Sequence, residues 1–203
     1  MQRAAPRALW WRWVRATTGG EVLGFLAPAL AGAVVTGRGL PAAVVFACLV
    51  AAGTAEGAVL GLAQALALRA VLPELRANEW VGATALAAAV SWAIGAVPVA
   101  TGSGIAAVPP AALVGFGAVL LLSMGVLQWT VLRRHVRHAV WWIPATAGAW
   151  LAGLVAFLAV TTPLWQEGQP AAVLVAIGAL GGLVMAAVVA AVTGLALVRL
   201  VHR

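Results

Sequence analysis

The chain has 203 residues, of which 64% are hydrophobic and only 8% are charged, and its formal net charge at pH 7 is +7. An ordinary soluble domain carries roughly a quarter charged residues, so this composition excludes a water-soluble fold. The basic residues stand at the ends of apolar runs and form no patch, which excludes a nucleic-acid surface as the reason for the positive charge. We therefore expect an integral membrane protein whose first partner is the lipid bilayer.

Several apolar runs are long enough to cross a membrane, since a hydrocarbon core about 30 Å thick needs roughly 20 apolar residues per helix. Short connections rich in glycine, proline or arginine separate these runs. Residues 1–203 are therefore expected to form a single transmembrane domain. In chain order, the expected helices cover residues 16–36, 41–68, 80–101, 110–132, 141–162 and 171–198.

The segment 1–15, before the first expected helix, is basic and rich in tryptophan. We expect it to lie at the membrane interface, with indoles at headgroup depth and guanidinium groups on phosphates. Its start is similar to a signal peptide, but the helix that follows belongs to a repeat, so we expect the segment to be retained. The anchoring residues would be Trp10, Trp11, Arg12, Trp13 and Arg15.

Arginine positions predict the orientation, because cytoplasmic loops carry the excess of basic residues. With six spans, only Arg38 falls on one side, so both termini and the segment 1–15 are expected in the cytoplasm. Every basic residue is arginine, and together with abundant alanine and glycine this indicates a GC-rich genome, so we expect a bacterial cytoplasmic (inner) membrane. The arginines on the other side are Arg3, Arg7, Arg12, Arg15, Arg69, Arg76, Arg133, Arg134, Arg137, Arg199 and Arg203.

Two patterns recur along the chain, one in the odd helices and one in the even helices. The odd pattern is Trp13, Ala16, Thr17, Gly19 and Gly24, which recurs as Trp142, Ala145, Thr146, Gly148 and Gly153, while a third copy begins with Trp80, Ala83 and Thr84. The even pattern is Gly61, Gln64 and Arg69, which recurs as Gly125, Gln128 and Arg133; its third copy ends at Arg199 and has Gly194 in place of glutamine. The predicted fold class is an all-α membrane protein of six transmembrane helices, arranged as three parallel-repeat two-helix hairpins at about 13–69, 80–134 and 141–200.

This pattern of a Trp-led helix followed by a Gly-x-x-Gln-x-x-x-x-Arg helix resembles uncharacterised multi-pass integral membrane proteins of bacteria. The likeness spans nearly the whole chain. It implies a multi-pass membrane protein and brings no activity with it.

Two carboxyl groups, those of Glu21 and Glu56, are predicted inside the bilayer, where an ionisable group costs at least a few kcal/mol. The repeat places Trp150 and Trp92 where Glu21 stands, so the acids belong to the first hairpin alone. One hypothesis is a proton- or cation-linked site. The other is a packing role, in which each carboxyl is hydrogen-bonded by neighbouring polar side chains. Candidates for that bonding are Thr17, Thr18, Thr54 and Gln64.

The remaining intramembrane polar residues are expected to hold helices together. Gln64 and Gln128 lie about 7 to 8 Å inside their arginines and are predicted to bond between helices. Pro28 is expected to kink the first helix just above Glu21. Close helix packing is predicted at three glycine pairs, Gly20 with Gly24, Gly57 with Gly61, and Gly178 with Gly182.

Arginines at the cytoplasmic helix ends are expected to contact anionic lipid headgroups. The cluster from Arg133 to His138 contains two histidines, but two imidazoles among three cations make a poor metal site, so no metal is expected. The predicted lipid contacts are Arg12, Arg15, Arg69, Arg133, Arg134, Arg137 and Arg199.

Catalytic motifs are largely excluded. Gly102, Ser103 and Gly104 are superficially similar to the nucleophile turn of rhomboid proteases, but every histidine is predicted on the opposite side of the membrane. No metal-binding histidine helix, phosphate loop, nucleotide fingerprint or haem ligand set is present. We expect no catalytic residue, no cofactor and no enzymatic activity.

The leading functional hypothesis is transport or binding of a small molecule or ion within the helix bundle, with Glu21 and Glu56 as its polar centre. The alternative is a non-catalytic structural or accessory subunit of a membrane complex, with a homo-oligomer or a membrane-protein partner. A water-accessible cavity that reaches Glu56 would favour the first hypothesis, whereas a carboxyl sealed by its neighbours would favour the second.

Overall fold

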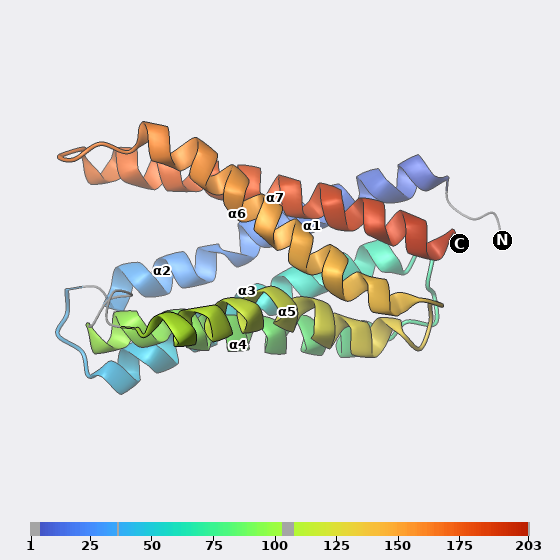
Figure 1. Ribbon diagram of the computed structural model, residues 1–203, viewed down its shortest axis with the longest axis horizontal. Helices are drawn as coiled ribbons and strands as arrows, with labels where there is room; N and C mark the ends of the chain where they lie inside the picture. The colour runs from blue at the N-terminus through green and yellow to red at the C-terminus, as the bar shows by residue number, and fades with distance from the viewer. Residues whose placement is uncertain (1–4, 36, 103–107, 203) are drawn as a thin grey trace.

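The computed structural model describes residues 5–35, 37–102 and 108–202, and every regular element in these ranges is helical (Figure 1). Arg3, Arg203, Ser103 and Gly104 lie outside the described residues. Six helical segments are long and apolar enough to cross a membrane, which agrees with the predicted number of spans. The elements are α1 (Pro6–Gly24), α2 (Leu26–Val35), α3 (Ala42–Leu68), α4 (Ala77–Thr101), α5 (Pro110–Leu132), the 3-10 turn η2 (Ala139–Trp141), α6 (Trp142–Leu164) and α7 (Ala171–Val201).

The first span consists of α1 and α2, which are separated at Phe25. Pro28 explains this break, because its nitrogen has no hydrogen to donate to the carbonyl oxygen of Gly24 one turn earlier. The predicted kink above Glu21 is therefore confirmed. The predicted start at residue 16 is wrong, since α1 begins at Pro6, a residue well suited to the first turn of a helix. An arginine within a helix can extend its guanidinium group to water, so the arginines of the segment 1–15 did not mark where this helix begins.

The spans form a closed ring. Each span packs against the next one along the chain, and α1 packs against α7 to close the circle, while α2 packs mainly against α3. Both chain termini lie at one end of the bundle, called the termini end below, and the opposite end is the far end (Figure 1). All six spans meet closely at the termini end, where the largest cluster of buried hydrophobic side chains lies.

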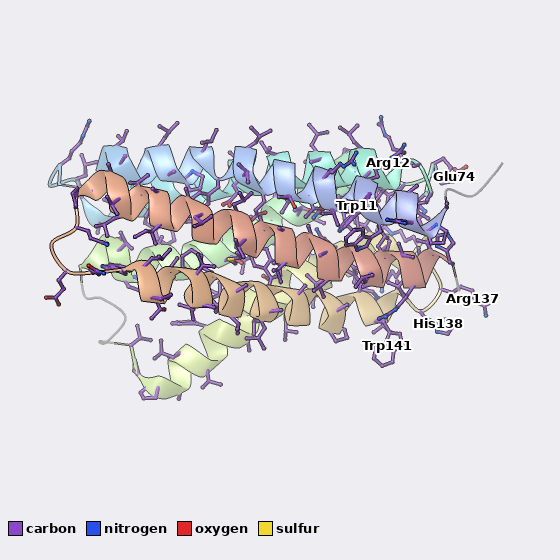
Figure 2. All side chains as sticks on the ribbon, turned by 90° about the horizontal axis from the view of Figure 1, so that it is seen from above. Trp11, Arg12, Glu74, Arg137, His138 and Trp141 are labelled. Atoms are coloured by element: carbon purple, nitrogen blue, oxygen red, sulfur yellow. The ribbon has the colours of Figure 1, made fainter. Side chains whose placement is uncertain are left out.

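The far end is packed more loosely. The first buried residue of α7 is Gly181, ten residues after its start, and the first buried residue of α5 is Met124. Toward this end, the α6–α7 hairpin separates from α3, α4 and α5, and α5 swings away from its neighbours (Figures 1 and 2). The ring is therefore tight at the termini end, whereas toward the far end α2, α3 and α4 stay packed around Val35, Leu49 and Ala96 while the other spans diverge.

Small residues allow the closest helix contacts. A Cβ atom on Gly24 would lie 2.9 Å from the backbone oxygen of Glu56, and one on Gly57 would lie 2.9 Å from the Cα atom of Ala85. Gly20 and Gly61 are equally crowded, so two of the three predicted glycine pairs are confirmed. The third is wrong, because Gly178 and Gly182 have nothing within 4 Å; the crowded position is Gly181, against Thr161 and Phe157.

Candidate functional site in the intramembrane core

Three tryptophans meet on the bundle axis near the termini end and form what we call the Trp layer. Trp13 of α1, Trp80 of α4 and Trp142 of α6 are each at most 1% exposed. Their ring centroids are 5.7 to 6.5 Å apart, with two of the three pairs edge to face, an arrangement that aromatic rings favour. The layer fills the centre of the ring of helices at this depth.

Each indole of the Trp layer donates a hydrogen bond to the end of another span. Trp80 donates to Oε1 of Gln64 at 3.1 Å, and Trp142 donates to Oε1 of Gln128 at 3.0 Å. The Nε2 atom of Gln128 donates to Gln64 Oε1 at 2.9 Å and to the Thr84 hydroxyl at 3.0 Å. The two amides thus form the interhelical hydrogen bonds that their depth predicts.

Trp13 bonds differently because α7 has Gly194 where the even pattern has glutamine. A Cβ atom at Gly194 would lie 3.0 Å from Cδ1 of both Trp10 and Trp13, so the glycine makes room for two indoles. The neighbouring residue supplies the acceptor instead, and Trp13 donates to the Thr193 hydroxyl at 2.9 Å. Trp10 donates to the carbonyl oxygen of Ala191 at 3.0 Å.

These contacts correct the predicted interfacial anchor. Trp13 lies in the core and not among headgroups, and Trp10 is bonded to α7. Trp11 is 43% exposed and stacks with Arg15, whose guanidinium carbon lies 5.8 Å from the ring centroid. Only one side of α1 therefore faces outward at this end, because a helix distributes neighbouring residues around its whole circumference.

The two intramembrane carboxyl groups lie near each other, about one third of a bilayer beyond the Trp layer. Glu21 is eight residues from Trp13, and Glu56 is eight residues from Gln64 on an antiparallel span, which places both about 12 Å further along the axis. The two carboxyls are close enough to interact electrostatically. Glu56 is only 7% exposed and packs against Gly24, at the break between α1 and α2.

Trp92 of α4 is the hydrogen-bond donor to Glu56, with its Nε1 atom 2.6 Å from Oε2. This partner was missed by sequence reasoning, which favoured threonines and Gln64. Thr54 instead bonds to the carbonyl oxygen of Val50, and Gln64 belongs to the Trp layer. Spacing gave no signal for this contact, because Trp92 is twelve residues beyond Trp80 and so lies about a third of a turn around α4 from it.

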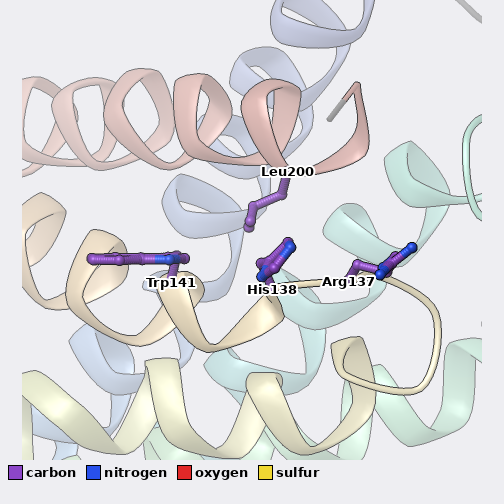
Figure 3. Close-up of a pocket in the computed structure, with 4 residues that line it drawn as sticks. All are labelled: Arg137, His138, Trp141 and Leu200. Carbon is purple, nitrogen blue, oxygen red and sulfur yellow. The ribbon is translucent and has the colours of Figure 1, made fainter.

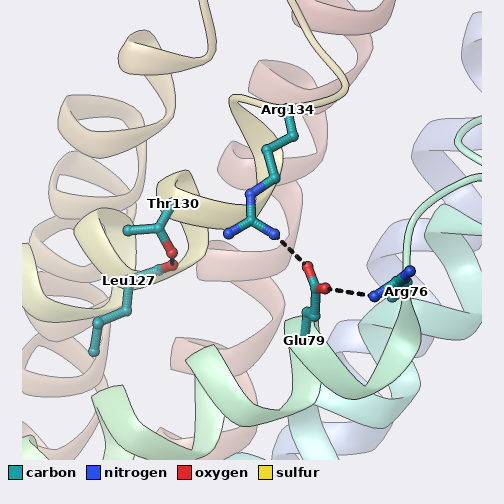
Figure 4. Close-up of polar contacts among 5 residues, drawn as sticks. All are labelled: Arg76, Glu79, Leu127, Thr130 and Arg134. Carbon is teal, nitrogen blue, oxygen red and sulfur yellow. Dashed lines mark hydrogen bonds and ion pairs between the residues drawn. The ribbon is translucent and has the colours of Figure 1, made fainter.

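The acid pair has no basic partner among the described residues. Both ion pairs found there involve Glu79, which binds Arg76 at 3.6 Å and Arg134 at 2.8 Å at the termini end (Figure 4). In addition, the hydroxyls of Thr17, Thr18 and Thr146 are buried without a hydrogen-bond partner in the protein. Polar groups in this part of the core therefore have unused capacity to bind a proton, water or a cation.

The arginines predicted to contact lipid are all exposed, but they differ in what holds them. Arg134 is tied to Glu79, so its guanidinium is partly occupied by a protein carboxylate. Arg133 stacks on Trp129, with its guanidinium carbon 4.8 Å from the ring centroid. Arg137 lines a pocket at the termini end. Figure 2 shows Arg137 at the same end of the bundle as Arg12. Arg69 directly follows α3 and Arg199 lies in the last turn of α7, so both are at this end too.

Two pockets lie away from the acid pair. One, of about 730 Å³, is an apolar groove between α4 and α5 near the far end, lined in part by Val97, Leu113 and Phe116. The other, of about 480 Å³, is lined by Arg137, His138, Trp141 and Leu200 (Figure 3). Neither is lined by Glu21 or Glu56. The described residues contain no group of three or more His, Cys, Asp or Glu side chains that could hold a metal ion.

Comparisons with known proteins leave the family resemblance a prediction. No protein-family model matches the chain, no curated protein matches it, and no solved structure matches it. Function must therefore be argued from this core itself.

Proposed function

We propose that the protein binds or transports a small cation, or a solute coupled to protons, at the pair Glu21 and Glu56, and that it is not an enzyme. The observation that carries this proposal is the pairing of two carboxyl groups inside the bilayer, with no basic partner among the described residues. Ionisable residues at this depth are costly, and they are retained where ions or protons bind. Two neighbouring acids lower that cost by sharing a proton or a cation.

The helix break beside the acids supports the same role. Broken transmembrane helices of transporters use carbonyl oxygens freed at the break, together with carboxylates, to coordinate cations near the bilayer midplane. Pro28 leaves the Gly24 carbonyl without its usual helical donor, and Gly24 packs directly against Glu56. Two carboxyl groups and one backbone carbonyl oxygen thus come from one crossing point of α1 and α3.

Access from the far end fits the packing of the bundle. The Trp layer fills the axis on the side of the termini, and the spans diverge on the other side (Figure 1). Thr17 lies one helical turn from both Trp13 and Glu21, and its buried hydroxyl lacks a protein partner. A water molecule bound to this hydroxyl would complete its hydrogen bonds and hydrate a bound cation.

The test is infrared difference spectroscopy of the carboxyl stretch in lipid, from acidic to alkaline pH, with and without sodium, potassium or a protonated amine. Glu56→Gln assigns the Glu56 band, and Glu79→Gln, a half-buried acid at the termini end, is the matched control. We expect the Glu56 band to titrate and its midpoint to shift with one of the cations. A band that neither titrates nor responds to any cation would falsify the proposal.

A second candidate is a structural or accessory subunit, and one observation favours it. Glu56 is 7% exposed and bonded to Trp92, and neither described pocket reaches it. In that case the carboxyl would fix the crossing of α3 and α4. Glu56→Gln would then leave cation binding unchanged, while Trp92→Phe would lower the thermal stability of the bundle by breaking the same hydrogen bond.

We also propose that the fold is a threefold repeat of hairpins in a bacterial cytoplasmic membrane, with both termini in the cytoplasm. The cyclic hydrogen bonds of the Trp layer support the repeat, since each leading tryptophan reaches the even helix of another hairpin. The arginine distribution supports the orientation. Cysteine accessibility in intact cells, with single cysteines placed at Gly39 and at Arg137 in a Cys48→Ala background, would test the orientation.

A further inference from the structure

We propose that the pocket formed by Arg137, His138, Trp141 and Leu200 is a binding site for one anionic phospholipid. Its volume of about 480 Å³ lies within the range of small-molecule sites. It is built by the connection between α5 and α6 on one side and by the end of α7 on the other (Figure 3). This inference is independent of the acid pair.

The charge of the pocket suits a phosphate group. Arg137 and His138 line it, and no carboxylate of the described residues does. The neighbouring Arg134 is held by Glu79, whereas Arg137 takes part in neither of the ion pairs found among the described residues. The first turn of the helical segment η2 to α6 begins directly after His138, so its free backbone N–H groups add partial positive charge at the same place. A guanidinium binds phosphate through two parallel hydrogen bonds.

The backbone of the connection holds these side chains outward. Val136 and Ala139 are 9% and 3% exposed and anchor the segment on both sides. Between them, His138 adopts a φ of 58°, the only positive φ of a non-glycine residue in the described chain. This left-handed turn allows Arg137 and His138 to be exposed while Val136 and Ala139 on either side of them are buried. The polar part of the pocket is therefore positioned by the core and not by a loose loop.

The apolar part of the pocket identifies the ligand as a lipid. Trp141 is 61% exposed and directly precedes Trp142 of the Trp layer, so it lies where α6 enters the bilayer. Exposed tryptophans at this depth lie among headgroups and upper acyl chains. Figure 3 shows Leu200 pointing toward His138 across the pocket. A phosphodiester on Arg137 would thus place its glycerol and acyl chains along Trp141 and Leu200, whereas free phosphate would leave this surface uncovered.

The test is native mass spectrometry of the full chain in detergent, titrated with phosphatidylglycerol or with phosphatidylcholine. We expect one tightly bound phosphatidylglycerol and no such site for phosphatidylcholine. Arg137→Gln should weaken binding about fivefold, the effect of one basic residue on an anionic headgroup. Arg7→Gln removes an exposed arginine of α1 at the same end but outside the pocket, so it should leave the affinity unchanged.

The controls separate a pocket from general attraction to charge. Equal losses for Arg137→Gln and Arg7→Gln would overturn the proposal and leave only a diffuse basic surface. Trp141→Ala should weaken phosphatidylglycerol binding, while the thermal stability of this variant stays equal to that of the unmodified protein. If inorganic phosphate displaces the lipid completely and Trp141→Ala has no effect, the site binds phosphate alone and the lipid assignment is wrong.

Discussion

The two ends of the bundle are built from similar residues but packed very differently. At the termini end, Leu68, Leu132 and Leu197 are at most 1% exposed and surround the Trp layer. At the far end, α7 has no buried residue before Gly181. Both halves are apolar enough for lipid, so hydrophobicity does not distinguish them. The difference lies in polar hydrogen bonds and close glycine contacts, because lipid gives apolar helices no preference for one another.

The contrast between the two halves of the bundle indicates where rigidity and function are expected to lie. The tight half holds the amides, the threonine acceptor and the ion pairs of Glu79, which together fix the relative positions of the six spans. The acid pair lies near the boundary between the two halves.

The largest effect is expected from a bulky residue at a helix crossing in the tight half. Gly57→Leu would push a side chain into Ala85 and the carbonyl oxygen of Thr84, both backbone contacts that cannot move aside. We expect a loss of about 3 kcal/mol or more in unfolding free energy. Unfolding of the purified protein in detergent micelles by a denaturing detergent would measure it.

The control for this change is Gly178→Leu in the far half of α7, where nothing lies within 4 Å. It adds the same side chain to the same kind of helix and should leave stability nearly unchanged. Equal losses at Gly57 and Gly178 would contradict the contrast between the two halves.

A smaller loss is expected when the Trp layer loses one donor. Trp142→Phe keeps an aromatic ring but leaves the Gln128 oxygen without its indole partner. An unpaired buried acceptor costs about 1 to 3 kcal/mol, so we expect a loss of about 2 kcal/mol in the same unfolding assay. Trp165→Phe, at a residue that is 66% exposed near the far end, should have no measurable effect.

Thr193→Val tests the acceptor that replaces the missing glutamine. It removes the hydroxyl that Trp13 bonds at 2.9 Å while conserving volume. The expected loss is about 1 kcal/mol, typical of an interhelical hydrogen bond in a membrane protein. Thr162→Val, at an exposed position near the end of α6, is the matched control. A stable Thr193→Val protein would mean that the Trp13 bond contributes little to closing the ring.

The smallest effect is expected at the surface of the tight half. Glu79→Gln removes the ion pairs to Arg76 and Arg134, but the three side chains are 28%, 77% and 58% exposed. Exposed pairs contribute at most about 1 kcal/mol, and salt screens them. Thermal unfolding at low and high salt should show a small difference between the proteins that vanishes at high salt. A difference that persists at high salt would indicate a packing role for Glu79.

Sequence patterns predicted individual residues well where one dominant physical requirement acts. Pro28 breaks the first span because proline has no N–H to donate, a property of the residue itself. Gln64 and Gln128 bond between helices because an amide at that depth has no water to bind. The exact residue that makes a close helix contact was harder to predict, since the contact expected at Gly182 is made by Gly181.

The pattern of apolar runs predicted the number of spans and the positions of most of their ends, because a bilayer demands about 20 apolar residues for each crossing. It also singled out Glu21 and Glu56 as costly residues. The fold was needed to show that the two acids are close enough to interact electrostatically, that Trp92 donates a hydrogen bond to Glu56, and that Thr193 accepts the Trp13 bond in place of a glutamine. These pairings join distant segments, and they depend on the rotation and crossing of each helix, which hydrophobicity leaves open in a chain that is apolar on all sides.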